Sequence, residues 1–222
     1  MNLPGKQHQK ARWTRILGVD PAAAGPTGYG IVEGDGRCCR MLHYGALKIE
    51  PKRKMAGPGG ALQDVYELIC RLIEEFSPDA LAVESVFTAL NRRTALRLAE
   101  VRGVVLLAAA QHGLEAHSYA PREVKANIAG HGHADKRQMQ TMVRALLSMN
   151  VIPEPSDAAD ALAVALCHLQ AEQVRRRFGL PDKNAVPKPR APRKASRSSN
   201  AVATTPVGSA TPTRLPRILS TR

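Results

Sequence analysis

Two aspartates at the start of an apolar stretch have the spacing that catalytic or metal-binding work requires. Asp157 and Asp160 are three residues apart and are followed by small or aliphatic side chains over residues 161–166. At helical pitch this spacing puts both carboxylates on one face. A carboxylate among packed apolar residues must be neutralised, hydrogen-bonded or bound to a cation, because burying an unpaired charge is costly. The pair therefore predicts partners from elsewhere in the chain.

A simpler explanation is equally good for the first of these residues. Ser156 is a suitable N-cap, and an aspartate in the first turn interacts favourably with the helix dipole. Asp157 alone could thus serve only to begin a helix. Asp160 lies about one turn further in, where capping no longer explains it.

Two more carboxylates end predicted buried strands. Residues 15–20 (RILGVD) and 80–84 (ALAVE) are nearly continuous apolar runs that finish at Asp20 and Glu84. Between them, residues 61–76 repeat apolar side chains at helical spacing. A strand, helix, strand connection makes the two strands parallel. If these strands are neighbours, both acids emerge at the same edge of the sheet.

The rest of the pattern predicts one α/β domain. Residues 27–32 and about 40–49 are expected to form a meander with the first strand, and residues 57–60 a glycine-rich connection. Further elements are a long helix over 91–113 with a buried apolar half at 104–110, a strand over 115–120, and helices starting at 121, 134 and 156, the last reaching 178. This order indicates a ribonuclease-H-like fold, a five-stranded mixed sheet flanked by helices.

Four acids at these places indicate phosphodiester hydrolysis. Two divalent ions held about 3.5–4 Å apart can activate a water and stabilise a leaving oxygen. Mg²⁺ is suited to carboxylates, waters and substrate phosphate. Asp20, Glu84, Asp157 and Asp160 are of the right type, and their joint placement carries more weight than any one of them.

The chain also resembles the RuvC family of Holliday-junction resolvases over about residues 15–170. The similar segments are ILGVDP (16–21), TGYG (27–30), VESVF (83–87), AEVRG (99–103), PREVK (121–125) and DAADALA (157–163). The resemblance implies a homodimeric crossover junction endodeoxyribonuclease that acts in recombination and DNA repair. Such an enzyme makes paired symmetric nicks in four-way junction DNA. It uses Mg²⁺, two ions per active site with Mn²⁺ as a substitute, and works with the RuvA and RuvB branch-migration proteins.

The same resemblance implies roles for individual residues. Asp20, Glu84, Asp157 and Asp160 would hold the metal ions. The catalytic set would also contain two lysines near the scissile phosphate, Lys125 and Lys136, which are otherwise explained as solvated surface.

Direct contacts to DNA are implied for a further group of residues. Phe87 would stack on a base near the junction centre, with packing in the core as its alternative. Asn91, Arg92, Arg93 and the two lysines are expected to bind DNA. Phosphate contact and helix solubility explain Arg92, Arg93 and Arg97 equally well.

Composition divides the 222 residues into three parts. We expect residues 1–14 to be flexible, 15–180 to form the nuclease domain and 181–222 to be a basic disordered tail. The tail has nine Lys and Arg, one acidic residue and seven prolines. It supplies +8 of the net charge of +13, so residues 1–180 together carry only +5. We expect a cytoplasmic protein, because no apolar run is long enough to span a bilayer and the N-terminus lacks the apolar core of a signal peptide.

Three other functions compete with the resolvase reading. Another ribonuclease-H-like nuclease, either RNA-processing or transposase-like, would share the acids. A non-catalytic DNA-binding protein of the same fold would not need four of them. An ATP-binding phosphotransferase of the actin type requires a second related domain, for which the chain is too short. The four cysteines have no pairing that indicates zinc or a disulfide framework.

Overall fold

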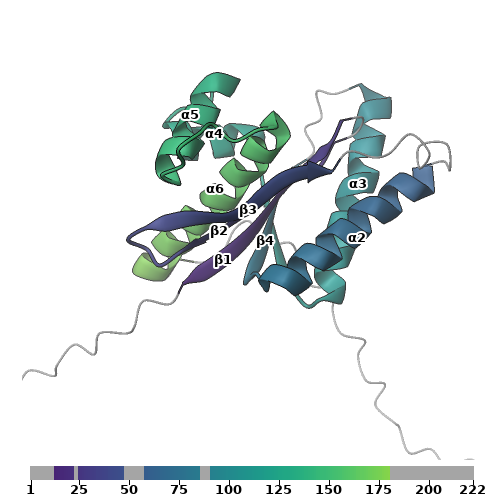
Figure 1. Cartoon of the computed structure of the whole chain (residues 1–222), viewed down its shortest axis with the longest axis horizontal. Coiled ribbons are helices and arrows are strands. Elements are labelled where there is room, and N and C mark those ends of the chain that lie inside the picture. Colours follow the sequence, from purple (N-terminus) through teal and green to yellow (C-terminus); the bar gives the residue numbers. More distant parts are fainter. Residues whose placement is uncertain (1–12, 23–24, 48–57, 86–90, 181–222) are drawn as a thin grey trace, which may run out of the picture. The chain divides into compact units, whose positions relative to one another are not determined.

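The computed structural model describes residues 13–22, 25–47, 58–85 and 91–180, and all structural statements below concern these residues. Its centre is a five-stranded mixed sheet with the order β3-β2-β1-β4-β5 (Figure 1). The strands are β1 (Thr14–Asp20), β2 (Thr27–Gly34), β3 (Cys39–Leu47), β4 (Ala80–Glu84) and β5 (Glu115–Tyr119). The expected five strands are therefore confirmed, with boundaries that move by one or two residues.

Strand pairing places the first two acids side by side. β1 runs antiparallel to β2 and parallel to β4, and Val19 pairs with Val83. Asp20 and Glu84 directly follow this pair, at the edge of the sheet where both strands end. The predicted adjacency of the two strands is confirmed.

Helices cover both faces of the sheet (Figure 1). One face packs on α2 (Pro58–Phe76) and α3 (Arg92–Gln111), and the other on α4 (Pro121–Ala129), α5 (Lys136–Leu146) and α6 (Ser156–Phe178). Alternation along β1 produces the two faces, since Leu17 and Val19 belong to the core beneath α2 and α3 while Ile16 belongs to the core beneath α6. Within the described ranges, no helix has the length and apolar character to cross a membrane.

Two expectations about the helices on the first face are wrong. α2 begins at Pro58, so most of the glycine-rich stretch 57–60 is helical. Proline suits a first helical turn, where its missing N–H is no loss. The apolar half of α3 is not wholly buried, because Leu107 is 52% exposed. α3 lies on the outside of the domain and buries only one stripe, which includes Val105, Ala108 and Ala109.

Residue 135 fixes where α5 starts. The Asp135 carboxylate accepts a hydrogen bond of 2.8 Å from the Gln138 backbone N–H, and the Gln138 side chain accepts one of 2.9 Å from the Asp135 backbone N–H. This reciprocal cap begins the helix at Lys136, two residues later than the periodicity predicts. It also holds the turn that presents Lys136.

Candidate active site

The strand-end acids form a hydrogen-bonded pair. Burial, followed by the charge of Glu84, raises the pKa of Asp20 to about 9. Asp20 also shares a side-chain hydrogen bond with Glu84, and the charges of Asp160 and Asp157 raise its pKa further. Near neutral pH, Asp20 therefore keeps its proton and donates it in this hydrogen bond. Such perturbed carboxylates are typical of functional sites.

The second pair of acids comes from α6 and meets two lysines. Burial raises the pKa of Asp160, and the nearby charge of Asp157 acts in the same direction. The charges of Lys136 and Lys125 oppose that rise. Lys136 Nζ lies 3.9 Å from Asp160 Oδ2, and the Lys125 charge also lowers the pKa of Glu84, although burial keeps that pKa above its ordinary value. Acids and lysines that are far apart in sequence thus interact directly.

A pocket of about 210 Å³ collects four of the predicted residues. Its lining comes from β4, α4, α5 and α6, and consists of Glu84, Pro121, Val124, Lys125, Lys136, Met139, Asp160, Ala163 and Val164. The pocket has carboxylates and ammonium groups on an apolar base. This combination suits a phosphate group. The lysine ammonium groups can hold it, while the carboxylate oxygens on the same pocket wall can act as metal ligands.

Three glycines, for which no role was predicted, allow α6 to lie directly on the sheet. A Cβ on Gly28 would overlap the carbonyl oxygen of Asp157, and one on Gly18 would overlap that of Ala161. One on Gly30 would come within 2.7 Å of a methyl group of Leu162. The available signal was the alternation of glycine along two strands together with an alanine-rich helix. These close contacts place Asp157 and Asp160 at the sheet edge.

The start of α6 differs from the expected cap. Pro155 is the N-cap residue, Ser156 is the first helical residue, and no side chain hydrogen-bonds to the cap position. Ser156 therefore does not cap the helix as predicted. Asp157 does lie in the first turn, where the helix dipole favours a negative charge.

Glu33 is a buried acid with a structural role, and its surroundings differ from those of Asp20. It is 4% exposed and accepts hydrogen bonds from Arg15 and Arg40, at 2.9 and 2.7 Å. Burial alone would raise its pKa, but the two arginines outweigh burial and lower it. Asp20 has the opposite surroundings, because its nearest charges are other acids. The acids at the sheet edge therefore destabilise one another's charged forms. A purely structural role does not explain such an arrangement.

The carboxylate oxygens of the four acids suit a hard divalent cation, but these side chains are not grouped closely. All four acids offer carboxylate oxygens, which are the ligands that Mg²⁺ prefers. Among the described residues, however, no three His, Cys, Asp or Glu side chains are grouped tightly enough to ligate one ion. Ligation would therefore require the carboxylates to move closer together. A bound cation would offset the mutual repulsion of these like charges and so favour the closer arrangement.

The predicted DNA-binding residues have mixed outcomes. Arg92, Arg93 and Arg97 are exposed on the first turns of α3. Asn91 caps α3, since its side-chain oxygen accepts a hydrogen bond of 2.9 Å from the Thr94 backbone N–H. Phe87 lies outside the described residues, as do residues 1–12 and the tail from 181.

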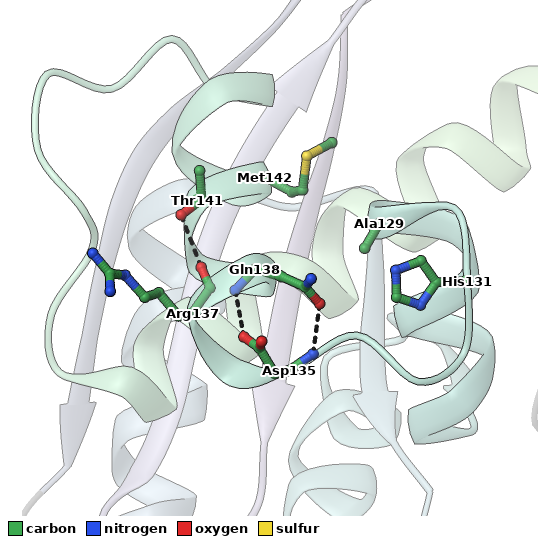
Figure 2. Close-up of a pocket in the computed structure, with 7 residues that line it drawn as sticks. All are labelled: Ala129, His131, Asp135, Arg137, Gln138, Thr141 and Met142. Carbon is green, nitrogen blue, oxygen red and sulfur yellow. Dashed lines mark hydrogen bonds between the residues drawn. The ribbon is translucent and has the colours of Figure 1, made fainter.

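A larger pocket of about 430 Å³ lies on another side of α5 (Figure 2). Asp135 and Gln138 line it, but their polar atoms form the reciprocal cap described above. The Thr141 hydroxyl donates to the Arg137 carbonyl oxygen at 2.8 Å. His131 also lines this pocket, which contains none of the predicted acids or lysines. Size alone therefore does not identify the active site.

Comparison with known proteins agrees with this geometry. A family model described as "Crossover junction endodeoxyribonuclease RuvC" matches residues 16–168. A protein of that name from Natranaerobius thermophilus is 43% identical over 163 residues, which cover 73% of this chain and 99% of the relative.

Solved structures give the same result. The "Thermus thermophilus RuvC structure" matches with a TM-score of 0.64 and 33% identity, over 75% of this chain and 97% of that one. The structure titled "T. thermophilus RuvC in complex with Holliday junction substrate" matches with a TM-score of 0.66 and 32% identity, over 72% and 96% of the two chains. The sheet order, the acid group and these matches together show that the chain belongs to the RuvC family, with the ribonuclease-H-like fold.

Proposed function

We propose that this chain is a Mg²⁺-dependent crossover junction endodeoxyribonuclease that resolves Holliday junctions by paired symmetric nicks. The observation that carries the proposal is the pocket that joins Glu84 and Asp160 to Lys125 and Lys136, beside Asp20, whose pKa is raised by burial and by the charge of Glu84. Family membership supports the same activity. A non-catalytic DNA-binding protein would have no use for a group of acids that disfavours its own charged state.

Four-way junction DNA is the proposed substrate. A relative that covers most of this domain was solved with a Holliday junction substrate. The exposed Arg92 and Arg93 at the start of α3 offer guanidinium groups to phosphates. Asn91 at the helix cap and Phe87 complete the proposed DNA contacts. In this role Phe87 stacks on an unpaired base near the junction centre.

The acids and the lysines have different proposed roles in phosphodiester hydrolysis. A water oxygen loses a proton and forms a bond to phosphorus, the bond from phosphorus to one ester oxygen breaks, and that leaving oxygen gains a proton. Lys125 and Lys136 hold the phosphate and offset the negative charge that develops on its oxygens. Asp20, Glu84, Asp157 and Asp160 are the proposed ligands of the divalent ions, two per site, with Mn²⁺ able to replace Mg²⁺.

Bound divalent metal would lower the pKa of the attacking water and stabilise the leaving oxygen. The protein's own contribution is to gather hard oxygen ligands at one edge of the sheet and to keep two ammonium groups next to them. The raised pKa of Asp20 means that binding of the ion must release a proton. Metal affinity should therefore rise with pH.

A homodimer is the proposed assembly, because a four-way junction presents two opposed strands for cutting. The outer face of α3 supports this proposal. Leu96 is 67% exposed and Leu107 is 52% exposed, and their spacing of 11 residues places them on one side of the helix. Exposed apolar residues that share a helix face are suited to an interface between copies.

Two further proposals rest on family membership alone. We propose the RuvA and RuvB branch-migration proteins as partners, since they would deliver the junction to the nuclease. We also propose that the protein acts in the cytoplasm, where the bacterial chromosome is repaired.

Acid variants test the active-site assignment. With Mg²⁺ and a four-way junction, Asp20→Asn, Glu84→Gln and Asp157→Asn should each abolish cutting and leave junction binding largely intact. Glu33→Gln is the control, because it removes a buried acid that lies outside the proposed metal site, and it should still cut if it folds. Cutting at the wild-type rate by any of the first three variants would remove that residue from the site.

A further inference from the structure

A buried hydrogen bond ties the helix that carries two of the acids to a distant strand of the sheet. Tyr119 is the last residue of β5 and is fully buried, while His168 lies on α6 and is 2% exposed. The Tyr119 hydroxyl and His168 Nδ1 are 2.7 Å apart and form a hydrogen bond. α6 therefore has a directional attachment to β5 in addition to its apolar packing.

Ring contacts restrain the same histidine. The His117 ring, also on β5, lies 4.2 Å from the His168 ring between centroids. The Tyr119 ring meets His168 edge-on at 5.8 Å, with an interplanar angle of 72°. Polar groups in a dry core are strongly constrained in orientation, because an alternative position costs them their partner. The geometry of the Tyr119–His168 bond is thus well defined.

Both ends of this bond lead into the proposed metal site. Tyr119 pairs with Glu84 in the register between β4 and β5, and the chain then enters α4, which carries Lys125. His168 lies on the same helix as Asp160, about two turns further on. The bond therefore links the part of the fold that holds Glu84 and Lys125 to the part that holds Asp160.

The acids themselves oppose this arrangement. The charge of Asp160 on α6 disfavours the charged form of Glu84 at the end of β4, so the repulsion between them acts to separate the helix from that strand end. The glycine contacts attach α6 to β1 and β2 only. On the β5 side α6 has apolar contacts with α4 and α5, and the Tyr119–His168 hydrogen bond adds a directional attachment there.

We propose that Tyr119 and His168 are positioning residues that hold the α6 aspartates against the strand-end acids and so set the affinity of the site for a divalent cation. This inference rests on the proposed metal site. Neither residue touches the pocket, so each acts through the placement of an element. Residues that orient metal ligands from outside the ligand set commonly change affinity by about 10–100-fold.

The test measures Mg²⁺ binding directly. Tyr119→Phe removes only the hydroxyl and keeps the ring. By calorimetric titration with Mg²⁺ alone, it should bind the ion about 3- to 10-fold more weakly than wild type, with an unchanged circular dichroism spectrum. Its cutting rate should recover at raised Mg²⁺ concentration, because the ligands themselves remain. Junction binding measured in chelator should not change.

A second variant removes the histidine partner of this hydrogen bond. His168→Phe keeps a ring against His117 and removes the nitrogen, and it should show a similar loss of Mg²⁺ affinity. The double variant should be no worse than the poorer single variant, because one bond can be lost only once. If Tyr119→Phe does not fold, His168→Phe provides the same comparison with wild type.

Tyr66→Phe is the matched control. The Tyr66 hydroxyl donates to Gln111 and so joins α2 to α3, two helices that carry none of the proposed acids. This variant should bind Mg²⁺ as wild type does. An equal loss in the control, additive losses in the double variant, or unchanged affinity in Tyr119→Phe would each overturn the inference. Absence of Mg²⁺ binding by wild type would instead reject the proposed metal site.

Discussion

At the scale of single residues, the acid group costs stability in the absence of divalent metal. The folded protein raises the pKa of Asp20 from 3.8 to about 9, so between these values unfolding releases a proton. The folded state binds more protons than the unfolded state in this window, and the free energy of unfolding therefore falls as pH rises. Below about pH 4 both states are protonated at this group and its penalty disappears.

This linkage predicts the effect of Asp20→Asn on stability. Without divalent metal at pH 8, the variant should melt at least about 2–4 °C above wild type, since 1 kcal/mol corresponds to roughly that shift in a domain of this size. At pH 4 the difference should shrink. Thermal unfolding in chelator at both pH values measures it, and a variant that melts below wild type at pH 8 would contradict the electrostatic account.

Lysine 136 and its neighbour give a second prediction at this scale. Lys136 lines the acid pocket, whereas Arg137, the next residue on α5, lines the other one. Lys136→Ala should slow cutting by about 10- to 100-fold, because a positioned charge at the reacting phosphate is lost. Arg137→Ala should change the rate by no more than about threefold, as exposed residues usually do. Equal rates for the two variants, measured at saturating junction, would remove Lys136 from the mechanism.

The positions of the charged residues at the strand ends were the easiest to predict from the sequence. Asp20 and Glu84 follow apolar strands, and their adjacency follows from a parallel crossover, which is a general rule of such folds. Tyr119 and His168 gave no comparable signal, because the two residues are 49 positions apart and a buried polar pair has no characteristic sequence spacing. Ser156 was the predicted cap of α6, but the helix includes Ser156 as its first residue and Pro155 takes the cap position.

At the scale of elements, the fit of α6 against β1 and β2 determines where the helix acids lie. Strands and helices were predictable from periodicity, but the depth at which α6 sits depends on glycines whose contacts are tertiary. An apolar strand pattern does not reveal whether a helix will lie directly on it. The start of α5 is a different case, because Asp135 and Gln138 have the spacing of a local capping box, a sequence signal that the apolar pattern alone does not include.

Gly28→Ala tests this fit. The added methyl group would overlap the Asp157 carbonyl oxygen, so the start of α6 must move. We expect a loss of about 1–3 kcal/mol in the free energy of unfolding, as for overpacked cores, together with loss of cutting. Gly59→Ala on α2 is the control, because its added Cβ meets nothing within 4 Å and alanine favours helix. Chemical denaturation measures this loss. A Gly28→Ala variant that is as stable as wild type would contradict the close packing.

At the scale of the whole molecule, charge is divided unevenly between the domain and the tail. Residues 181–222 supply +8, and the family model ends at residue 168. The acids, the lysines and the pocket all lie before that end. We therefore propose that the chemistry belongs to the domain, and we expect the tail to add general attraction to DNA.

Deletion of residues 181–222 tests this division. The shortened chain should cut a four-way junction at low salt at the wild-type rate, within about twofold, because surface changes away from the site have small effects. Its binding should depend less steeply on salt, since fewer phosphates are neutralised by basic residues. Loss of cutting at low salt would show that the tail takes part in the reaction.

The central claim is that the acid pocket cuts branched DNA with the help of divalent metal. The most direct measurement compares a four-way junction with a linear duplex of the same sequence, with Mg²⁺ and with chelator. The account predicts symmetric paired nicks in the junction with Mg²⁺, an intact duplex, and no cutting in chelator. Equal cutting of junction and duplex, or cutting in chelator, would contradict it.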